Sequence, residues 1–139
     1  MRGSFRLSKP AYFTLGLALL AAVAGLDALA SAQVNIGVFY LLPIGFVAWF
    51  CGGAWGYAMA FISATAWFLS DRAHGQAYSH WFIPYWNSVM RLGVFTLVTA
   101  LTGVIKKQRR LNDLEREMSE LKSSMVSLVS HEFGNFLTT

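Results

Sequence analysis

The sequence predicts an all-α membrane protein: a four-transmembrane-helix bundle whose last helix continues into a parallel dimeric coiled coil. Three observations support this class. Apolar residues make up 55% of the chain and charged residues only 13%, which is typical of membrane proteins. Four apolar segments fill residues 11–105. A heptad repeat follows, and residues 106–139, which contain it, carry most of the charged residues.

The predicted spans cover residues 11–30, 34–50, 54–69 and 84–105. A helix needs about 20 residues to cross ~30 Å of hydrocarbon, with about 17 as the lower limit. The second and third segments are therefore short. Cys51-Gly52-Gly53 is expected to join them as the tight turn of a helical hairpin, with a re-entrant pair as the alternative.

Two features within these spans predict how the helices pack. Pro43 is expected to kink the second span and to free a backbone carbonyl. Small residues recur every four positions on the third span, at Gly52, Gly56, Ala60 and Ala64. Such a face lets a neighbouring helix approach closely.

The basic residues predict the orientation in the membrane. One cluster (Arg2, Arg6, Lys9) lies in the N-terminal segment 1–10, and the other follows the fourth span at Lys106, Lys107, Arg109 and Arg110. The positive-inside rule then makes both termini cytoplasmic in a multi-pass protein of the bacterial inner membrane. The connections at 31–33 and 71–83 would face outward. Cations at membrane edges indicate lipid as a partner, and they do not indicate nucleic acid. A cleavable signal peptide ending near Ala30 is the alternative for the first span.

Polar residues gather near the predicted outer ends of the spans. Ionisable groups at such depths are costly unless they are paired, so we expect them to line a sensing cavity. The candidate ligand-sensing residues are Asp27, Tyr40, Asp71, Tyr78, His80, Trp86, Asn87 and Arg91. An ion pair between Asp27 and Arg91 is one hypothesis. Separate snorkelling of each side chain to the interface is the alternative.

Two histidines, His74 and His80, lie in the outer connection. Imidazoles at this spacing are possible ligands for haem iron or another metal ion. The alternative is that they are surface residues in an aromatic interfacial loop that needs no cofactor.

The segment 106–129 predicts a signalling coiled coil. Its apolar residues are spaced alternately by three and four positions, at Leu111, Leu114, Met118, Leu121, Met125 and Leu128. This is an a/d seam that favours a homodimer. In a parallel pair, Arg110 at g faces Glu115 at e of the partner, and Glu117 at g faces Lys122 at e. Both charge pairs therefore favour one register and one direction.

No Pro or Gly interrupts the join from Val104 to Leu111, so the fourth span and the coiled coil are expected to form one helix. Extending the seam backwards places Val104 at a and Lys107 at d. A lysine in the seam weakens pairing there. We expect this join to transmit a signal by rotation or a register shift between partner helices.

Residues 130–139 contain the motif Ser130-His131-Glu132-Phe133, followed by Gly134-Asn135-Phe136-Leu137-Thr138. This motif resembles the H-box that opens the dimerisation and phosphoacceptor domain of bacterial sensor histidine kinases. Asn135, Leu137 and Thr138 fit variants of that box. Gly134 and Phe136 depart from its usual Arg and Pro.

The resemblance implies that His131 is the phosphoacceptor and Glu132 the base that orients its ring. The intact protein would then be a protein-histidine kinase that uses ATP and passes the phosphoryl group to a cytoplasmic response regulator. This segment contains no Gly-rich nucleotide loop and is expected to be inactive alone. Residues 10–105 also resemble four-span input modules that precede diguanylate cyclases. The alternatives are therefore a cyclase output, or a transmembrane haem- or metal-binding protein.

Overall fold

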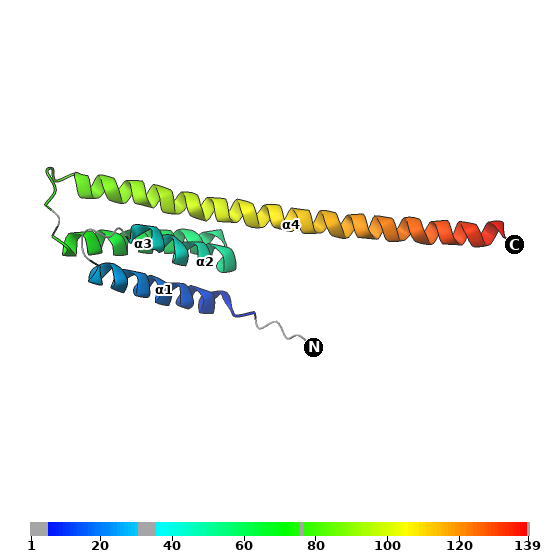
Figure 1. The fold of residues 1–139 in the computed structure, drawn as a ribbon, viewed down its shortest axis with the longest axis horizontal. Coiled ribbons are helices and arrows are strands. Elements are labelled where there is room, and N and C mark those ends of the chain that lie inside the picture. The colour runs from blue at the N-terminus through cyan, green and yellow to red at the C-terminus, as the bar shows by residue number, and fades with distance from the viewer. Residues whose placement is uncertain (1–5, 31–35, 76, 139) are drawn as a thin grey trace. The chain divides into compact units, whose positions relative to one another are not determined.

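The fold is known from a computed structural model that describes residues 6–30, 36–75 and 77–138. The described segments form α1 (Lys9–Leu29), the 3₁₀ helix η1 (Gly37–Tyr40), α2 (Leu41–Cys51), α3 (Gly53–Ala73) and α4 (Ile83–Leu137), as Figure 1 shows. No strand occurs among these residues, so the all-α prediction is confirmed. The predicted connection at 31–33 and the basic residue Arg2 lie outside the described residues.

The chain divides into two compact units. The first unit is Met1–Val104 and the second is Ile105–Thr139. Helix α4 contributes to both, because it runs for 55 residues without a break. The fourth predicted span and the heptad segment therefore belong to one continuous helix, as the sequence indicated.

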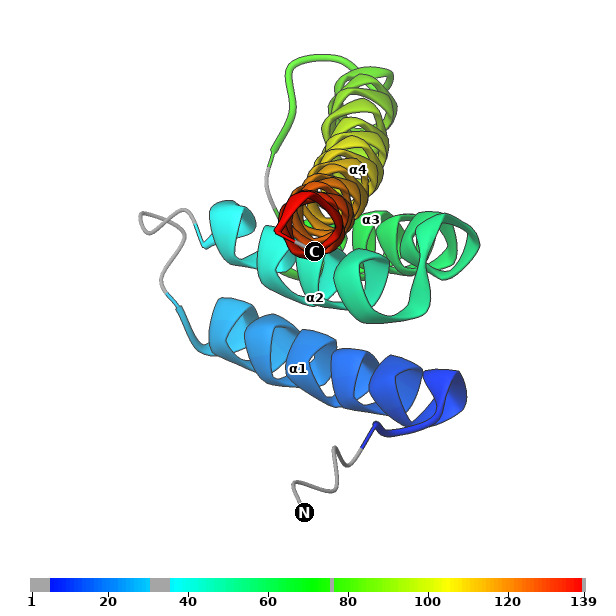
Figure 2. The same ribbon diagram turned by 90° about the vertical axis from the view of Figure 1, so that its right-hand side faces the viewer.

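In the first unit, α2 contacts both α1 and α3, and these two helices also contact each other (Figure 2). The core side chains come mainly from α2 and α3, and the buried apolar residues include Tyr40, Ile44, Val47, Met59, Ala60 and Trp67. The first part of α4 adds Phe95 to this core. This packing brings together residues that are distant in the sequence.

Glycines allow the closest approaches between these helices. A Cβ at Gly56 would lie 2.8 Å from the Cβ of Ala48 and 2.7 Å from Cγ2 of Thr99. A Cβ at Gly16 would clash with Val47. The small-residue face predicted on the third span therefore packs against other helices, and its members Ala60 and Ala64 are buried.

The predicted second span differs from the observed structure. In place of one helix over 34–50, a 3₁₀ turn at Gly37–Tyr40 precedes an α2 of only 11 residues. Pro43 falls in the first turn of α2, where its missing N–H has no intrahelical acceptor to lose. Helix α2 continues through Pro43, and the change of helix type lies before it, between Tyr40 and Leu41.

Two helices of the described chain, α1 and α4, are long and apolar enough to cross a membrane. The apolar segment Gly37–Cys51 is shorter than such a span, and α3 is not among the candidates.

Gly52, with φ of 101°, makes the predicted turn between α2 and α3. This backbone conformation is accessible to glycine at little cost.

Candidate functional site

A polar cluster lies within the first unit, and Asp27 on α1 is one of its centres. The Asp27 carboxylate accepts a hydrogen bond of 3.1 Å from the Tyr40 hydroxyl and one of 2.8 Å from the Ser70 hydroxyl. Tyr40 is fully buried at the end of η1, and Ser70 is on α3. Three separate elements are therefore joined through one carboxylate.

Arg91 on α4 forms the second centre of the cluster. Its guanidinium carbon lies 3.6 Å from the centroid of the Trp67 ring, which is a cation–π contact. Trp67 is on α3 and only 8% exposed. The carboxylates of Asp71 and Asp27 both lie close enough to stabilise the arginine charge.

The direct Asp27–Arg91 ion pair does not form among the described residues, where Asp27 bonds to Tyr40 and Ser70 instead. The reason is the position of α3. Its residue Ser70 holds Asp27 of α1, and its residue Trp67 holds Arg91 of α4. The two charges therefore interact through space, with α3 side chains as their immediate neighbours.

Asp71 forms the third centre of the cluster. It accepts a hydrogen bond from the Tyr78 hydroxyl, which belongs to the connection between α3 and α4. Burial, followed by this hydrogen bond, raises the pKa of Tyr78 above its ordinary value of 10.0. Asn87 lies within hydrogen-bonding reach of the same hydroxyl and acts in the opposite direction. The connection is thus tied to both flanking helices.

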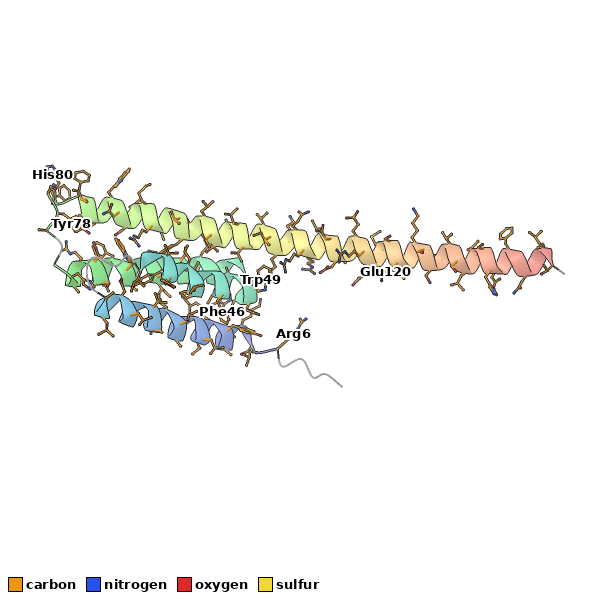
Figure 3. All side chains as sticks on the ribbon, in the orientation of Figure 1. Arg6, Phe46, Trp49, Tyr78, His80 and Glu120 are labelled. Carbon is orange, nitrogen blue, oxygen red and sulfur yellow. The ribbon has the colours of Figure 1, made fainter. Side chains whose placement is uncertain are left out.

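Two predicted sensing residues, His80 and Trp86, and the possible metal ligand His74 lie outside this network of contacts. The His80 ring stacks on Phe82 at 6.1 Å and is exposed, and the Trp86 side chain is 60% exposed. His74 caps the end of α3, where its Nδ1 lies 2.7 Å from the Ser70 carbonyl oxygen. Figure 3 shows Tyr78 and His80 at the end of the first unit where α3 is connected to α4.

Sequence reasoning missed Ser70 and Trp67, the α3 residues that hold Asp27 and Arg91. Both had a detectable signal. They lie three positions apart, and Asp71 follows directly, so all three occupy one turn of α3. A carboxylate and an arginine among apolar helices both need partners, and a serine and a tryptophan in such a turn are suitable ones.

The motif residues His131 and Glu132 lie in the second unit, near the C-terminal end of α4. Both side chains are exposed. The predicted seam residues of this unit are also exposed, for example Leu121 (65%) and Met125 (66%). The helix therefore exposes the His131 imidazole to solvent. It also exposes the apolar seam, which no other part of the described chain packs against.

No group of three His, Cys, Asp or Glu side chains among the described residues is arranged to hold a metal ion.

Comparison of the chain with protein-family models, with curated proteins and with solved structures finds no match.

Proposed function

We propose that this chain is the membrane-sensor and phosphoacceptor portion of a sensor histidine kinase, with His131 as the phosphorylated residue. The observation that carries the proposal is the motif Ser130-His131-Glu132 on an exposed part of α4, the helix whose N-terminal part is apolar enough to cross a membrane. One continuous helix thus links a candidate membrane span to a candidate nucleophile.

The chemistry explains why the two motif residues are adjacent. A neutral imidazole nitrogen of His131 attacks the γ-phosphoryl group of ATP, and the bond from that phosphorus to the bridging oxygen of ADP breaks. The neighbouring carboxylate of Glu132 accepts or orients the proton on the other ring nitrogen, which makes the attacking nitrogen a better nucleophile. The exposure of both side chains leaves them open to an ATP-bearing domain.

The surface of the first unit supports its insertion in lipid. Large apolar side chains are exposed along α1 and along the first part of α4, including Leu15, Leu19, Leu26, Val94, Leu97 and Leu101. A surface this apolar is suited to a membrane and poorly suited to water. Helix α3 has one face covered by other helices, as its buried residues Met59, Ala60 and Ser63 indicate. Its other face is exposed and also carries large apolar side chains, such as Phe61 and Leu69.

The exposed seam of the second unit supports a parallel homodimer. Leu111 and Leu114 are about half exposed, and Met118 is 70% exposed. Pairing with a second copy would bury this stripe, and the charges at Glu117 and Lys122 select the parallel direction. Each such exposed pair contributes only about 0.2–1 kcal/mol, so the membrane unit must also hold the dimer together.

A second apolar stripe appears beside the seam near His131. Val126, Val129 and Phe133 are spaced by three and four positions, and they are 63%, 54% and 64% exposed. A two-stranded pair covers only one narrow stripe. The wider apolar face is therefore suited to a helical hairpin dimer, which is the arrangement that the H-box resemblance implies.

The polar cluster supports the sensing role of the first unit. It connects α1, η1 and α3 to Arg91 on α4, so a stimulus that alters any of these contacts acts on the helix that carries His131. Such a switch requires contacts that are more stable in one signalling state of the protein than in the other.

The test uses the intact gene product in membranes, incubated with ATP labelled at the γ-phosphate. We expect an acid-labile, base-stable phosphate that is absent from His131→Gln and retained in Glu120→Gln, the matched control at an exposed position of the same helix. Equal labelling of His131→Gln and the unaltered protein would contradict the proposal.

A further inference from the structure

A groove of about 420 Å³ lies between α1 and α3 in the first unit. Its lining is mostly small and apolar, and consists of Ala24, Ala28, Leu69, Ser70, Ala73 and His74. The groove borders the polar cluster, because Ser70 belongs to both. A molecule in the groove would therefore lie one hydrogen bond away from Asp27.

The two polar residues of the groove both offer hydrogen-bond acceptors. The Ser70 carbonyl oxygen can only accept, so the His74 Nδ1–H must donate to it over their 2.7 Å separation. In the neutral ring this leaves Nε2 as an acceptor. The Ser70 hydroxyl gives its proton to Asp27 at 2.8 Å, so its oxygen is also left to accept. The complementary ligand must donate a hydrogen bond.

We propose that this groove binds a lipid-soluble alcohol, an apolar chain that ends in one hydroxyl group. The alanines and Leu69 would contact the chain, and the hydroxyl would donate to Nε2 of His74. A carboxylate head is disfavoured by the charge of Asp27 behind Ser70. An ammonium head is disfavoured because the Asp27 carboxylate is already satisfied by Tyr40, Ser70 and the nearby charge of Arg91, so the cost of taking the ammonium out of water is not offset.

Binding of an alcohol in this groove does not depend on the kinase proposal. The claim that the bound alcohol acts as a stimulus rests on that proposal. The ligand hydroxyl, held at Nε2 of His74, offers its oxygen as a second acceptor to the Ser70 hydroxyl, so occupancy competes with the hydrogen bond from Ser70 to Asp27. Through that cluster the bound alcohol would act on α4.

The experiment uses the intact protein in lipid vesicles with a photoreactive analogue of 1-decanol, and mass spectrometry locates the labelled residues. We expect saturable labelling of α1 and α3 at the groove, reduced by excess 1-decanol and not by decane, decylamine or decanoate. Ala28→Leu and, separately, Ala73→Leu fill the groove at exposed positions and should abolish this labelling. His74→Phe removes the acceptor and should lower it roughly tenfold.

Ala22→Leu is the matched control, because Ala22 is exposed on α1 and does not line the groove. It should label like the unaltered protein. Labelling that survives both groove-filling variants, or that decylamine or decanoate displaces better than 1-decanol, would overturn the inference. His131→Gln should label normally. A lack of phosphorylation with normal labelling therefore rejects the kinase proposal and leaves the groove site standing.

Discussion

At the scale of single residues, Asp27 shows how the first unit tolerates a carboxylate among apolar helices. Its oxygen receives two hydroxyl hydrogen bonds, from Tyr40 and Ser70, and the charge of Arg91 is close by. Hydrogen bonds to an ionised group are stronger than those between neutral groups. The carboxylate therefore holds α1, η1 and α3 together.

Tyr40→Phe should lower the free energy of unfolding by about 1 kcal/mol, because it removes one of these two bonds and leaves the buried ring in place. Detergent-unfolding titrations in mixed micelles measure the change. Thr65→Val is the control, since the Thr65 hydroxyl bonds only to Phe61 of its own helix and is exposed. If Tyr40→Phe and Thr65→Val were equally stable, the Asp27 network would contribute nothing to the fold.

Tyr78 predicts a specific pH dependence. Burial, and then its bond to Asp71, raise the pKa of the folded hydroxyl above 10.0, so the folded state holds this proton more tightly than the unfolded state. The contribution to stability is therefore complete below about pH 10 and is lost as the pH rises through the raised pKa. Ultraviolet titration of tyrosinate should show one late-ionising group fewer in Tyr78→Phe than in the unaltered protein.

Asp71→Asn tests the second cause of this shift. The variant removes the negative charge beside the hydroxyl, so the pKa of Tyr78 should fall towards its ordinary value while its burial remains. An unchanged titration in Asp71→Asn would show that Asp71 does not influence Tyr78.

At the scale of elements, α4 combines two environments in one helix. Its first part carries Phe95 and Thr99 into the core of the first unit, and its later part carries the exposed heptad residues. The change from one to the other falls near the unit boundary at Val104 and Ile105. A helix without a break is suited to transmit a rotation between its two ends.

Leu121→Asp should weaken the dimer at least roughly 100-fold, because it places an unpaired charge at a d position of the seam. Sedimentation of the detergent-solubilised protein measures the association. Ser123→Asp adds the same charge at an f position, where it stays in water, and should leave the dimer intact. Equal association of the two variants would rule out the proposed seam.

The sequence predicted the helical elements best where the signal is local and periodic. The continuous α4 follows from an unbroken helical pattern, and the Gly52 turn follows from adjacent glycines. The extent of α2 was missed, because the apolar run before Leu41 cannot by itself distinguish an α-helix from a 3₁₀ turn. The partners of Asp27 and Arg91 were also mispredicted, because which helix lies between two others is a tertiary property.

At the scale of the whole molecule, we propose that the first unit, which contains the polar cluster, is a membrane sensor, and that the helix carrying His131 pairs with a second copy. The cluster and the candidate nucleophile belong to different units, and α4 is the element common to both. Substitutions of the sensing residues should therefore alter the phosphorylation of His131 only by rotating or shifting α4.

Insertion of alanines between Lys107 and Gln108 tests this central claim most directly. Each added residue rotates the following helix by about 100°, whereas seven residues restore the register of the seam. We predict that insertions of two or five residues, which turn the following helix to roughly its opposite face, change His131 phosphorylation in membranes severalfold, and that an insertion of seven returns it towards the unaltered level. Phosphorylation that is the same for every insertion length would contradict transmission through α4.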